Sequence, residues 1–322
     1  MLLLLTGLRL RVDPVTMRIA SLLPSATEII CALGMRDQLV GRSHECDFPS
    51  DVATVRTLTR SHVKHEAVSG DIDLDVRRIL REVLAIYEVD VNALKDVAPS
   101  VVVTQNLCDV CAVSLSDVEK ALKEIASEVQ VVSLSPTRLS EVWDDIRRVG
   151  SVLGMESMAG RVVADLESRM DLVRSRAVVA DARPSVLTIE WLDPVMIGGM
   201  WMPELVELAG GVPLVTAAGD HAPTLDEEAL RELAPDTVLI KPCGFSLART
   251  RAEASALCAL LDRLGWKAWQ EGRVYLADGN AFFNRPGPRL AESLEIMAAC
   301  VHPELFEDMA EAHSSDYERL RP

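Results

Sequence analysis

The chain has 322 residues, of which 49% are hydrophobic and 25% are charged, and its net charge is −16. The hydrophobic content excludes an intrinsically disordered chain, and the length predicts about two domains. The acidic balance excludes nucleic acid as a partner, because phosphate binding needs clustered Lys and Arg. No apolar run reaches the ~18 residues of a membrane-spanning helix, so we expect a protein that is not embedded in a membrane.

Residues 1–16 are predicted to be a non-secretory N-terminal extension. The apolar run Leu2–Leu5 is shorter than the ~7–15 residues of a signal-peptide core, and Arg9 and Arg11 follow it. No Cys stands where a lipid anchor would be attached. Met17 is a second candidate for the first residue, since a strand pattern begins just after it. These features predict a cytoplasmic protein whose seven cysteines stay reduced.

Short β-type runs alternate with helical patterns in the first half of the chain, which is typical of an α/β fold with parallel sheets. Ser25 and Glu28 have the spacing of a helix capping box. Residues 139–180 are helical almost throughout, with a break near Gly154, and the part after the break predicts one helix that joins two lobes. The expected strands are 19–23, 39–41, 100–104 and 130–134, and the expected helices before residue 139 are 24–34, 76–96 and 115–127.

The alternation of strands and helices restarts after Pro184. The pattern therefore predicts two Rossmann-like lobes with parallel sheets. The expected strands of the second half are 185–190, 237–241 and 274–276, and the expected helices are 202–209, 225–233, 249–264 and 289–300. The predicted units are the extension 1–16, an N-terminal lobe 17–154, an interlobe helix 155–182, a C-terminal lobe 183–306 and a polar, frayed tail 307–322.

Four of the seven cysteines lie on predicted strand-exit loops, where ligands of open α/β sheets bind. Four thiolates from both lobes suit Zn²⁺ or an iron–sulfur cluster. A redox pair in the C-x-x-C segment, or thiols that shape the surface around an organic or corrinoid ligand, are the alternatives. The candidate metal ligands are Cys46, Cys108, Cys111 and Cys243.

The same loops carry the other candidate ligand-binding residues. The imidazole of His44 can bind cobalt, iron or zinc, and Arg285 can hold a carboxylate, amide or phosphate. Flat aromatic rings on the loops of the second lobe suit a macrocycle. The predicted binding residues are His44, Glu45, Gln105, Glu190, Trp191, Trp201, Phe245, Phe282, Phe283 and Arg285.

Catalytic motifs are missing from the sequence. No G-x-S-x-G elbow, P-loop or G-x-G-x-x-G follows a predicted strand, and no paired-carboxylate motif stands out. We therefore expect a binding protein rather than an enzyme, and assign no catalytic residue.

Five segments of the chain stand out together: RIASLLPSATEII (18–30), VGRSHECDFP (40–49), MPELVELAGGV (202–212), LDEEALRELAPDTVL (225–239) and RPGPRL (285–290). They resemble the helical-backbone metal-chelate receptor family, the substrate-binding proteins of iron-siderophore, haem and cobalamin importers. The similarity runs from Met17 to Phe306 and is nearest to the cobalamin-binding branch. The resemblance implies two α/β lobes joined by one long helix, with the ligand held in the cleft between them. It also places Phe282 where cobalamin receptors present an aromatic ring to the corrin.

Three functions follow from these observations. The first is a cytoplasmic binding protein that holds a metal-containing small molecule in the interlobe cleft, either a corrinoid such as cobalamin or a cysteine-ligated iron–sulfur cluster, with zinc as a further candidate. The second is the substrate-binding component of a cobalamin or iron-chelate ABC importer, which requires export and a permease partner. The third is a cytoplasmic redox or metal-dependent enzyme that uses Cys108 and Cys111.

Overall fold

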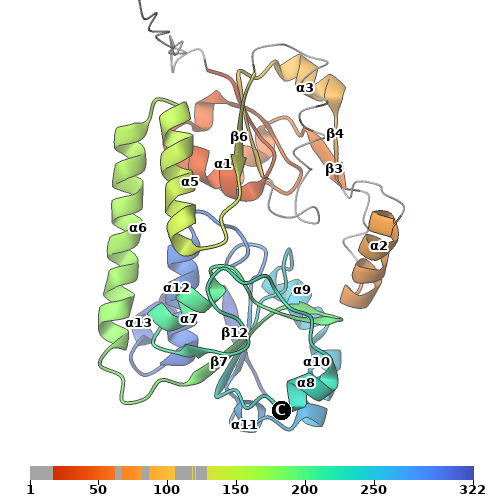
Figure 1. Ribbon diagram of the computed structural model, residues 1–322, viewed down its shortest axis with the longest axis vertical. Helices are drawn as coiled ribbons and strands as arrows, with labels where there is room; N and C mark the ends of the chain where they lie inside the picture. The colour runs from red at the N-terminus through yellow and green to blue at the C-terminus, as the bar shows by residue number, and fades with distance from the viewer. Residues whose placement is uncertain (1–16, 62–66, 82–86, 106–117, 119, 121–128) are drawn as a thin grey trace, which may run out of the picture.

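The computed structural model describes residues 17–61, 67–81, 87–105, 118, 120 and 129–322. Two α/β lobes lie one above the other, and the long helix α6 runs alongside both (Figure 1). The predicted fold class is therefore confirmed. None of the helices in the described ranges combines the length and the apolar character needed to cross a membrane.

The N-terminal lobe contains a parallel sheet in the order β2-β1-β5-β6. All five residues of β5 are buried, which explains the β-branched run at this place in the sequence. α1 (Pro24–Ala32) and α5 (Leu139–Val152) pack against the sheet, and two short 3₁₀ turns cover Arg36–Gln38 and Ser50–Thr54. The strands are β1 (Ile19–Ser21), β2 (Leu39–Arg42), β5 (Val101–Gln105) and β6 (Gln130–Leu134).

The expected helix over 76–96 is wrong. Helix α2 (Ser69–Arg81) lies earlier, and β4 (Tyr87–Val89) pairs antiparallel with β3 (Thr59–Ser61). Tyr87 and Val89 are buried, whereas Glu88 between them is partly exposed. This alternation is the two-residue period of a strand. The following helix α3 (Val91–Val97) begins at Asp90, whose carboxylate accepts a hydrogen bond from the N–H of Ala93 at 2.9 Å.

The C-terminal lobe contains a second sheet in the order β12-β11-β10-β7-β8, with β9 also paired to β7. The three central strands are parallel, so their carboxyl ends share one edge. The strands are β7 (Ser185–Leu192), β8 (Val195–Ile197), β9 (Val212–Pro213), β10 (Thr237–Ile240), β11 (Val274–Ala277) and β12 (Tyr317–Leu320). The helices are α7 (Met202–Leu208), α8 (Glu227–Arg231), α9 (Leu247–Ala252), α10 (Ala254–Leu264), α11 (Lys267–Gln270), α12 (Leu290–Val301) and α13 (Glu307–Ala312).

The C-terminal residues do not fray as the sequence predicted. They form α13 and β12, and β12 pairs antiparallel with β11. His313, between these elements, lies 2.9 Å from the carboxylate of Glu295 on α12 and 3.1 Å from that of Asp316. The polar composition that favoured disorder instead supplies the ion pairs that hold the tail to the lobe.

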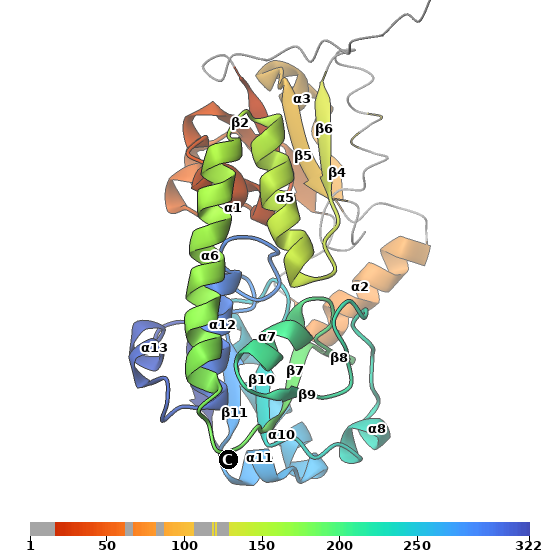
Figure 2. The same cartoon turned by 60° about the vertical axis from the view of Figure 1, so that its left-hand side comes forward.

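Helix α6 (Glu156–Ala177) has 22 residues and one buried stripe, which includes Val163, Leu166 and Met170. The stripe packs against α5 in the N-terminal lobe and against α12 in the C-terminal lobe, so one hydrophobic core extends through both (Figure 2). Arg169 adds an ion pair to Glu295 at 2.9 Å. Because both lobes bury apolar surface against the same helix, α6 fixes their spacing along one side.

A tight backbone contact sets the loops at the cleft edge of the C-terminal lobe. A Cβ at Gly279, after β11, would lie 2.6 Å from the carbonyl oxygen of Lys241 and against that of Pro242, after β10. Two strand-exit loops therefore pack backbone to backbone at a position that only glycine fits.

We expect Gly279→Ala to lower the free energy of unfolding by about 1–3 kcal/mol, because the neighbouring atoms are backbone and cannot rotate away. Gly160→Ala is the matched control: position 160 lies inside α6 with open space around it, so the same methyl group should stabilise the protein by about 0.5–1 kcal/mol. Urea unfolding of both variants measures the difference. Equal stability of the two variants would contradict the close approach at Gly279.

Candidate ligand-binding cleft

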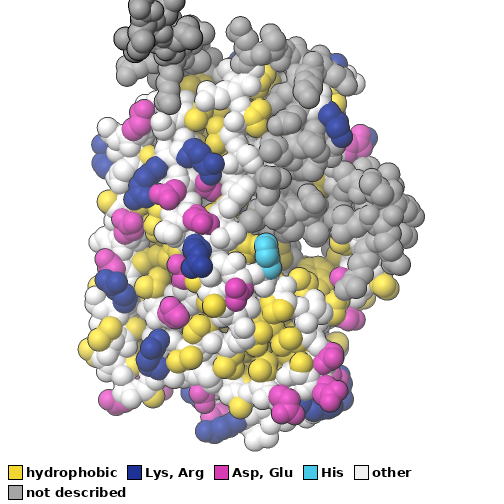
Figure 3. All heavy atoms as spheres, in the orientation of Figure 1, with side chains coloured by type: hydrophobic (Ala, Val, Ile, Leu, Met, Phe, Trp, Pro, Cys, Tyr) yellow, Lys and Arg dark blue, Asp and Glu magenta, His cyan; other side chains and the backbone are white. Residues whose placement is uncertain are grey.

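The carboxyl ends of the two parallel sheets face each other across the space between the lobes. The start of α1, directly after β1, and the loop after β2 both contact Arg285 in the loop after β11. In the space-filling view the surface is hollowed between the lobes, beside α2 (Figure 3). Ligands of open α/β sheets bind at such strand ends. The cleft is therefore the candidate site.

Four charged side chains form an interlobe junction where the two lobes contact each other. They are Glu28 and Asp47 from the N-terminal lobe, and Arg285 and Arg289 from the C-terminal lobe. Glu28 is only 4% exposed. Its carboxylate lies 3.1 Å from the guanidinium of Arg285 and 2.8 Å from that of Arg289. Arg285 also contacts Asp47 at 2.6 Å. Two carboxylates and two guanidinium groups thus neutralise one another.

The junction changes the protonation of its members. Burial alone would raise the pKa of Asp47, but the hydrogen bonds and charge of Arg285, with a further hydrogen bond from Asn280, outweigh it and hold this pKa below its usual value. Burial opposes the charged form of Arg285, yet hydrogen bonds and charge from Asp47 and Glu28 raise its pKa further. Asp47 and Arg285 are therefore charged at neutral pH.

The capping box predicted at the start of α1 is wrong. No side chain caps this helix, whose N-cap residue is Leu23. Glu28 instead binds two arginines that lie more than two hundred residues later in the chain. A charged partner from the other lobe stabilises a buried carboxylate more than a local N–H does.

Most of the predicted aromatic residues are buried inside the C-terminal lobe. The indole N–H of Trp201 donates to the carbonyl of Phe283 at 2.8 Å, and the Phe283 N–H donates to Ser293. These bonds hold Phe283 in the left-handed region, at φ 66°, with its ring fully buried. Phe282 is 8% exposed, and its ring faces the guanidinium of Arg289.

Trp191 is the one predicted aromatic residue that is half-buried rather than buried. Its ring meets that of Phe245 edge-on at 5.3 Å, and its N–H donates to the carbonyl of Asp193. Phe245 is buried, with the guanidinium of Arg249 over its face. Trp191 therefore offers an aromatic surface at the end of β7.

The predicted polar residues of the N-terminal lobe lie at its cleft-facing end. Nδ1 of His44 lies 2.7 Å from the hydroxyl of Thr59, and Nε2 lies 3.2 Å from the carboxylate of Glu45. Gln105 is buried at the end of β5. The imidazole is thus oriented by two neighbours of its own lobe.

The predicted cysteine site is only partly within the described residues. Cys46 is 2% exposed, its sulfur lies 3.0 Å from the hydroxyl of Thr27, and burial raises the pKa of its thiol to about 11. Cys243 is half-buried after β10. Cys108 and Cys111 lie outside the described residues. Across the described ranges, no three His, Cys, Asp or Glu side chains gather as a metal site.

A buried lysine fixes the position of the Glu190 carboxylate. Lys241 follows β10 and is fully buried, and its ammonium lies 3.0 Å from Glu190 Oε2 and 2.7 Å from Asn284 Oδ1. Asn284 in turn donates to the carbonyls of Lys241 and Gly279. Lys241 was not among the predicted site residues, although a charged residue at the end of a buried strand is a signal that could have identified it.

Helix α2 belongs to the N-terminal lobe by sequence but lies against the C-terminal lobe, on the opposite side of the cleft from α6 (Figure 1). Glu253, at the start of α10, accepts hydrogen bonds from the N–H and the hydroxyl of Ser69 at 2.9 and 2.6 Å. The guanidinium of Arg249 bonds to the carbonyl of Ala67. We call these contacts the α2 latch.

The junction predicts a large effect for Glu28→Gln. Removing one partner from a buried ion pair leaves a buried charge uncompensated, so we expect the free energy of unfolding to fall by about 3 kcal/mol. Glu271→Gln is the matched control, since Glu271 makes exposed ion pairs at 3.5 Å or longer and should contribute less than about 1 kcal/mol. Denaturant unfolding measures both, and equal losses would contradict the role of the junction.

The latch predicts a local effect for Glu253→Gln. Hydrogen bonds to a carboxylate are stronger than those to a neutral amide, so amide hydrogen exchange in α2 should accelerate about tenfold while α10 stays protected. Glu232→Gln, at the exposed end of α8, is the control. Unchanged exchange in α2 would show that Glu253 does not hold the helix.

Comparisons with known proteins agree with this architecture. Residues 19–281 match the family described as periplasmic binding protein. The chain is 24% identical over 301 residues to "Uncharacterized ABC transporter substrate-binding lipoprotein YvrC" of Bacillus subtilis (strain 168), which covers 90% of this chain and 82% of that protein.

Solved structures share the fold at low sequence identity. A periplasmic heme-binding protein from Pseudomonas aeruginosa has a TM-score of 0.66 and 18% identity, covering 89% of this chain and 92% of that one. The vitamin B12-binding protein BtuF of Vibrio cholerae has a TM-score of 0.61 and 18% identity, covering 88% and 96%. IsdE of S. aureus, complexed with heme, has a TM-score of 0.67 and 14% identity, covering 89% and 99%.

These findings correct the predicted cytoplasmic location. The matching family is one of periplasmic binding proteins, and the curated relative is a lipoprotein of an ABC transporter. Both work outside the cytoplasmic membrane. The short apolar run at residues 2–5, from which the location was predicted, was a weaker guide than the family.

Proposed function

The chain belongs to the periplasmic binding protein family, and on that premise we propose that it is the substrate-binding component of an ABC importer for a metal chelate of the tetrapyrrole class, heme or a corrinoid. The observation that carries this proposal is the extent of the family match. It covers the N-terminal lobe, α6 and most of the C-terminal lobe, and so both sides of the cleft.

The chemistry of the cleft supports a planar ligand. Trp191 offers a half-buried ring at the end of β7, and Glu190 beside it is a fixed hydrogen-bond acceptor. On the opposite lobe, His44, Glu45 and Gln105 are the proposed contacts. The partners that follow from the proposal are the ligand itself and the permease of an importer, to which the loaded protein would dock.

A cysteine-ligated cluster is not part of the proposal. The thiol of Cys46 is protonated at neutral pH and is enclosed with Thr27 inside its own lobe. A metal chelate brings its own metal ligands, so the cleft needs to supply only shape, stacking and hydrogen bonds.

Titration of the purified protein with cyanocobalamin and with hemin tests the proposal. Quenching of tryptophan fluorescence and calorimetry measure the binding. We expect at least one chelate to bind with one-to-one stoichiometry. Trp191→Ala should weaken binding by about threefold to tenfold, because one aromatic contact is lost, whereas Trp191→Phe, the matched control, should keep most of the affinity. Failure of both chelates to bind would refute the function.

A further inference from the structure

Glu190 presents a carboxylate that the protein holds in one place. Its Oε2 atom bonds to the ammonium of Lys241, and Lys241 is locked by Asn284. Asn284 uses both its amide hydrogen atoms on backbone carbonyls, so its Oδ1 can only face the lysine. The side chain of Glu190 keeps 23% exposure while that of Lys241 has none. The pair thus leaves its acceptor accessible at the carboxyl end of β7 and buries its donor.

The two arginines that follow Asn284 in the loop after β11 already have carboxylate partners. Arg285 and Arg289 bind Glu28 and Asp47 in the interlobe junction, and their side chains are 7% and 12% exposed. A ligand carboxylate that approached them would have to displace a protein carboxylate. The charged groups of the β7 and β11 exit loops are therefore poorly arranged to receive an anion.

We propose that Glu190, positioned by Lys241 and Asn284, selects tetrapyrrole ligands that carry hydrogen-bond donors at their rim, such as the carboxamides of a corrinoid, over ligands that carry carboxylates, such as the propionates of heme. The inference rests on the proposed function and narrows it. A carboxylate accepts strong hydrogen bonds from amide N–H groups but repels another carboxylate, and the repulsion grows as the cleft loses water.

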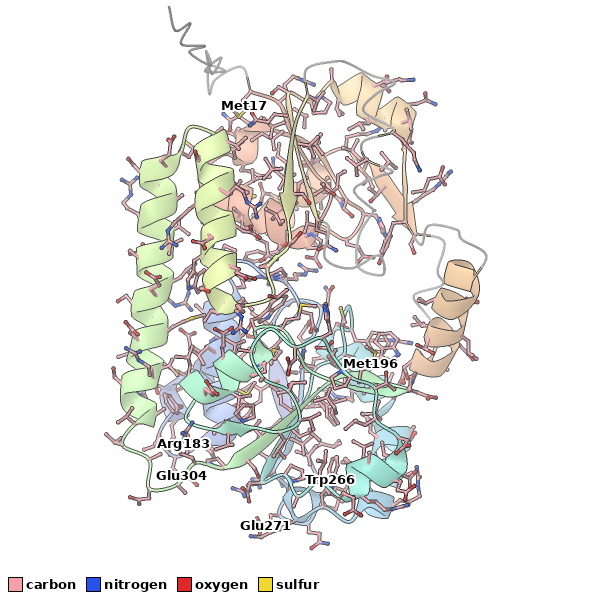
Figure 4. The ribbon with its side chains drawn as sticks, viewed as in Figure 1. Met17, Arg183, Met196, Trp266, Glu271 and Glu304 are labelled. Carbon is pink, nitrogen blue, oxygen red and sulfur yellow. The ribbon has the colours of Figure 1, made fainter. Side chains whose placement is uncertain are left out.

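Two probes with the same ring separate these cases. Dicyanocobinamide carries carboxamides around the corrin, and dicyanocobyrinic acid carries carboxylates in their place. We expect the wild-type protein to bind the amide ring at least tenfold more tightly. In Glu190→Gln the preference should fall by about tenfold, because the charge is lost while the shape is kept. Glu271→Gln, at the far end of the C-terminal lobe (Figure 4), should retain the wild-type preference.

The outcomes are distinct. Binding of neither ring, nor of hemin, would refute the proposed function and the inference with it. Equal or tighter binding of the carboxylate ring would overturn the inference alone and assign selectivity to a cation such as Arg138, exposed after β6. An unchanged preference for the amide ring in Glu190→Gln would also overturn the inference alone, because a group other than Glu190 would then set it. Circular dichroism of Glu190→Gln confirms that the variant is folded, and Glu190→Asp, which keeps the charge, should retain part of the preference.

Discussion

The arrangement of the two lobes depends on one buried carboxylate. Glu28 lies between the lobes, and a charge at that depth is stable only when it is paired and hydrogen-bonded. Arg285 and Arg289 supply both requirements, so the lobes must meet with these groups in register. Together with α6, which buries one apolar stripe against both lobes, the junction restricts the angle of the cleft.

The junction also determines which groups remain for a ligand. Arg289 lies between the rings of Phe48 and Phe282, at 4.1 and 5.3 Å from their centroids, so Phe282 serves the contact between the lobes. Arg285 is committed to Glu28 and Asp47. Among the described residues, the groups best placed to contact a ligand are then a half-buried tryptophan, Trp191, and a carboxylate that a buried lysine fixes, that of Glu190.

Local patterns of apolar residues predicted the fold well where the buried residues repeat with the period of a single helix or strand. The apolar stripe of α6 and the fully buried run of β5 are visible in the sequence because each element buries a continuous face. The short strand Tyr87–Val89 was missed because three residues carry little periodicity, and its partner at Thr59–Ser61 is distant in the sequence. The C-terminal strand was missed for the same reason.

The site was less predictable, since its contacts join residues from different lobes. The sequence placed Arg285 and Glu190 on strand-exit loops, but it could not show that the arginine binds a glutamate of α1 or that a lysine holds the carboxylate. Those pairings arise only when the sheets face each other. They also preorganise the cleft: a binding site whose charges are already paired and fixed loses little conformational freedom when the ligand enters, so more of the contact energy remains as affinity.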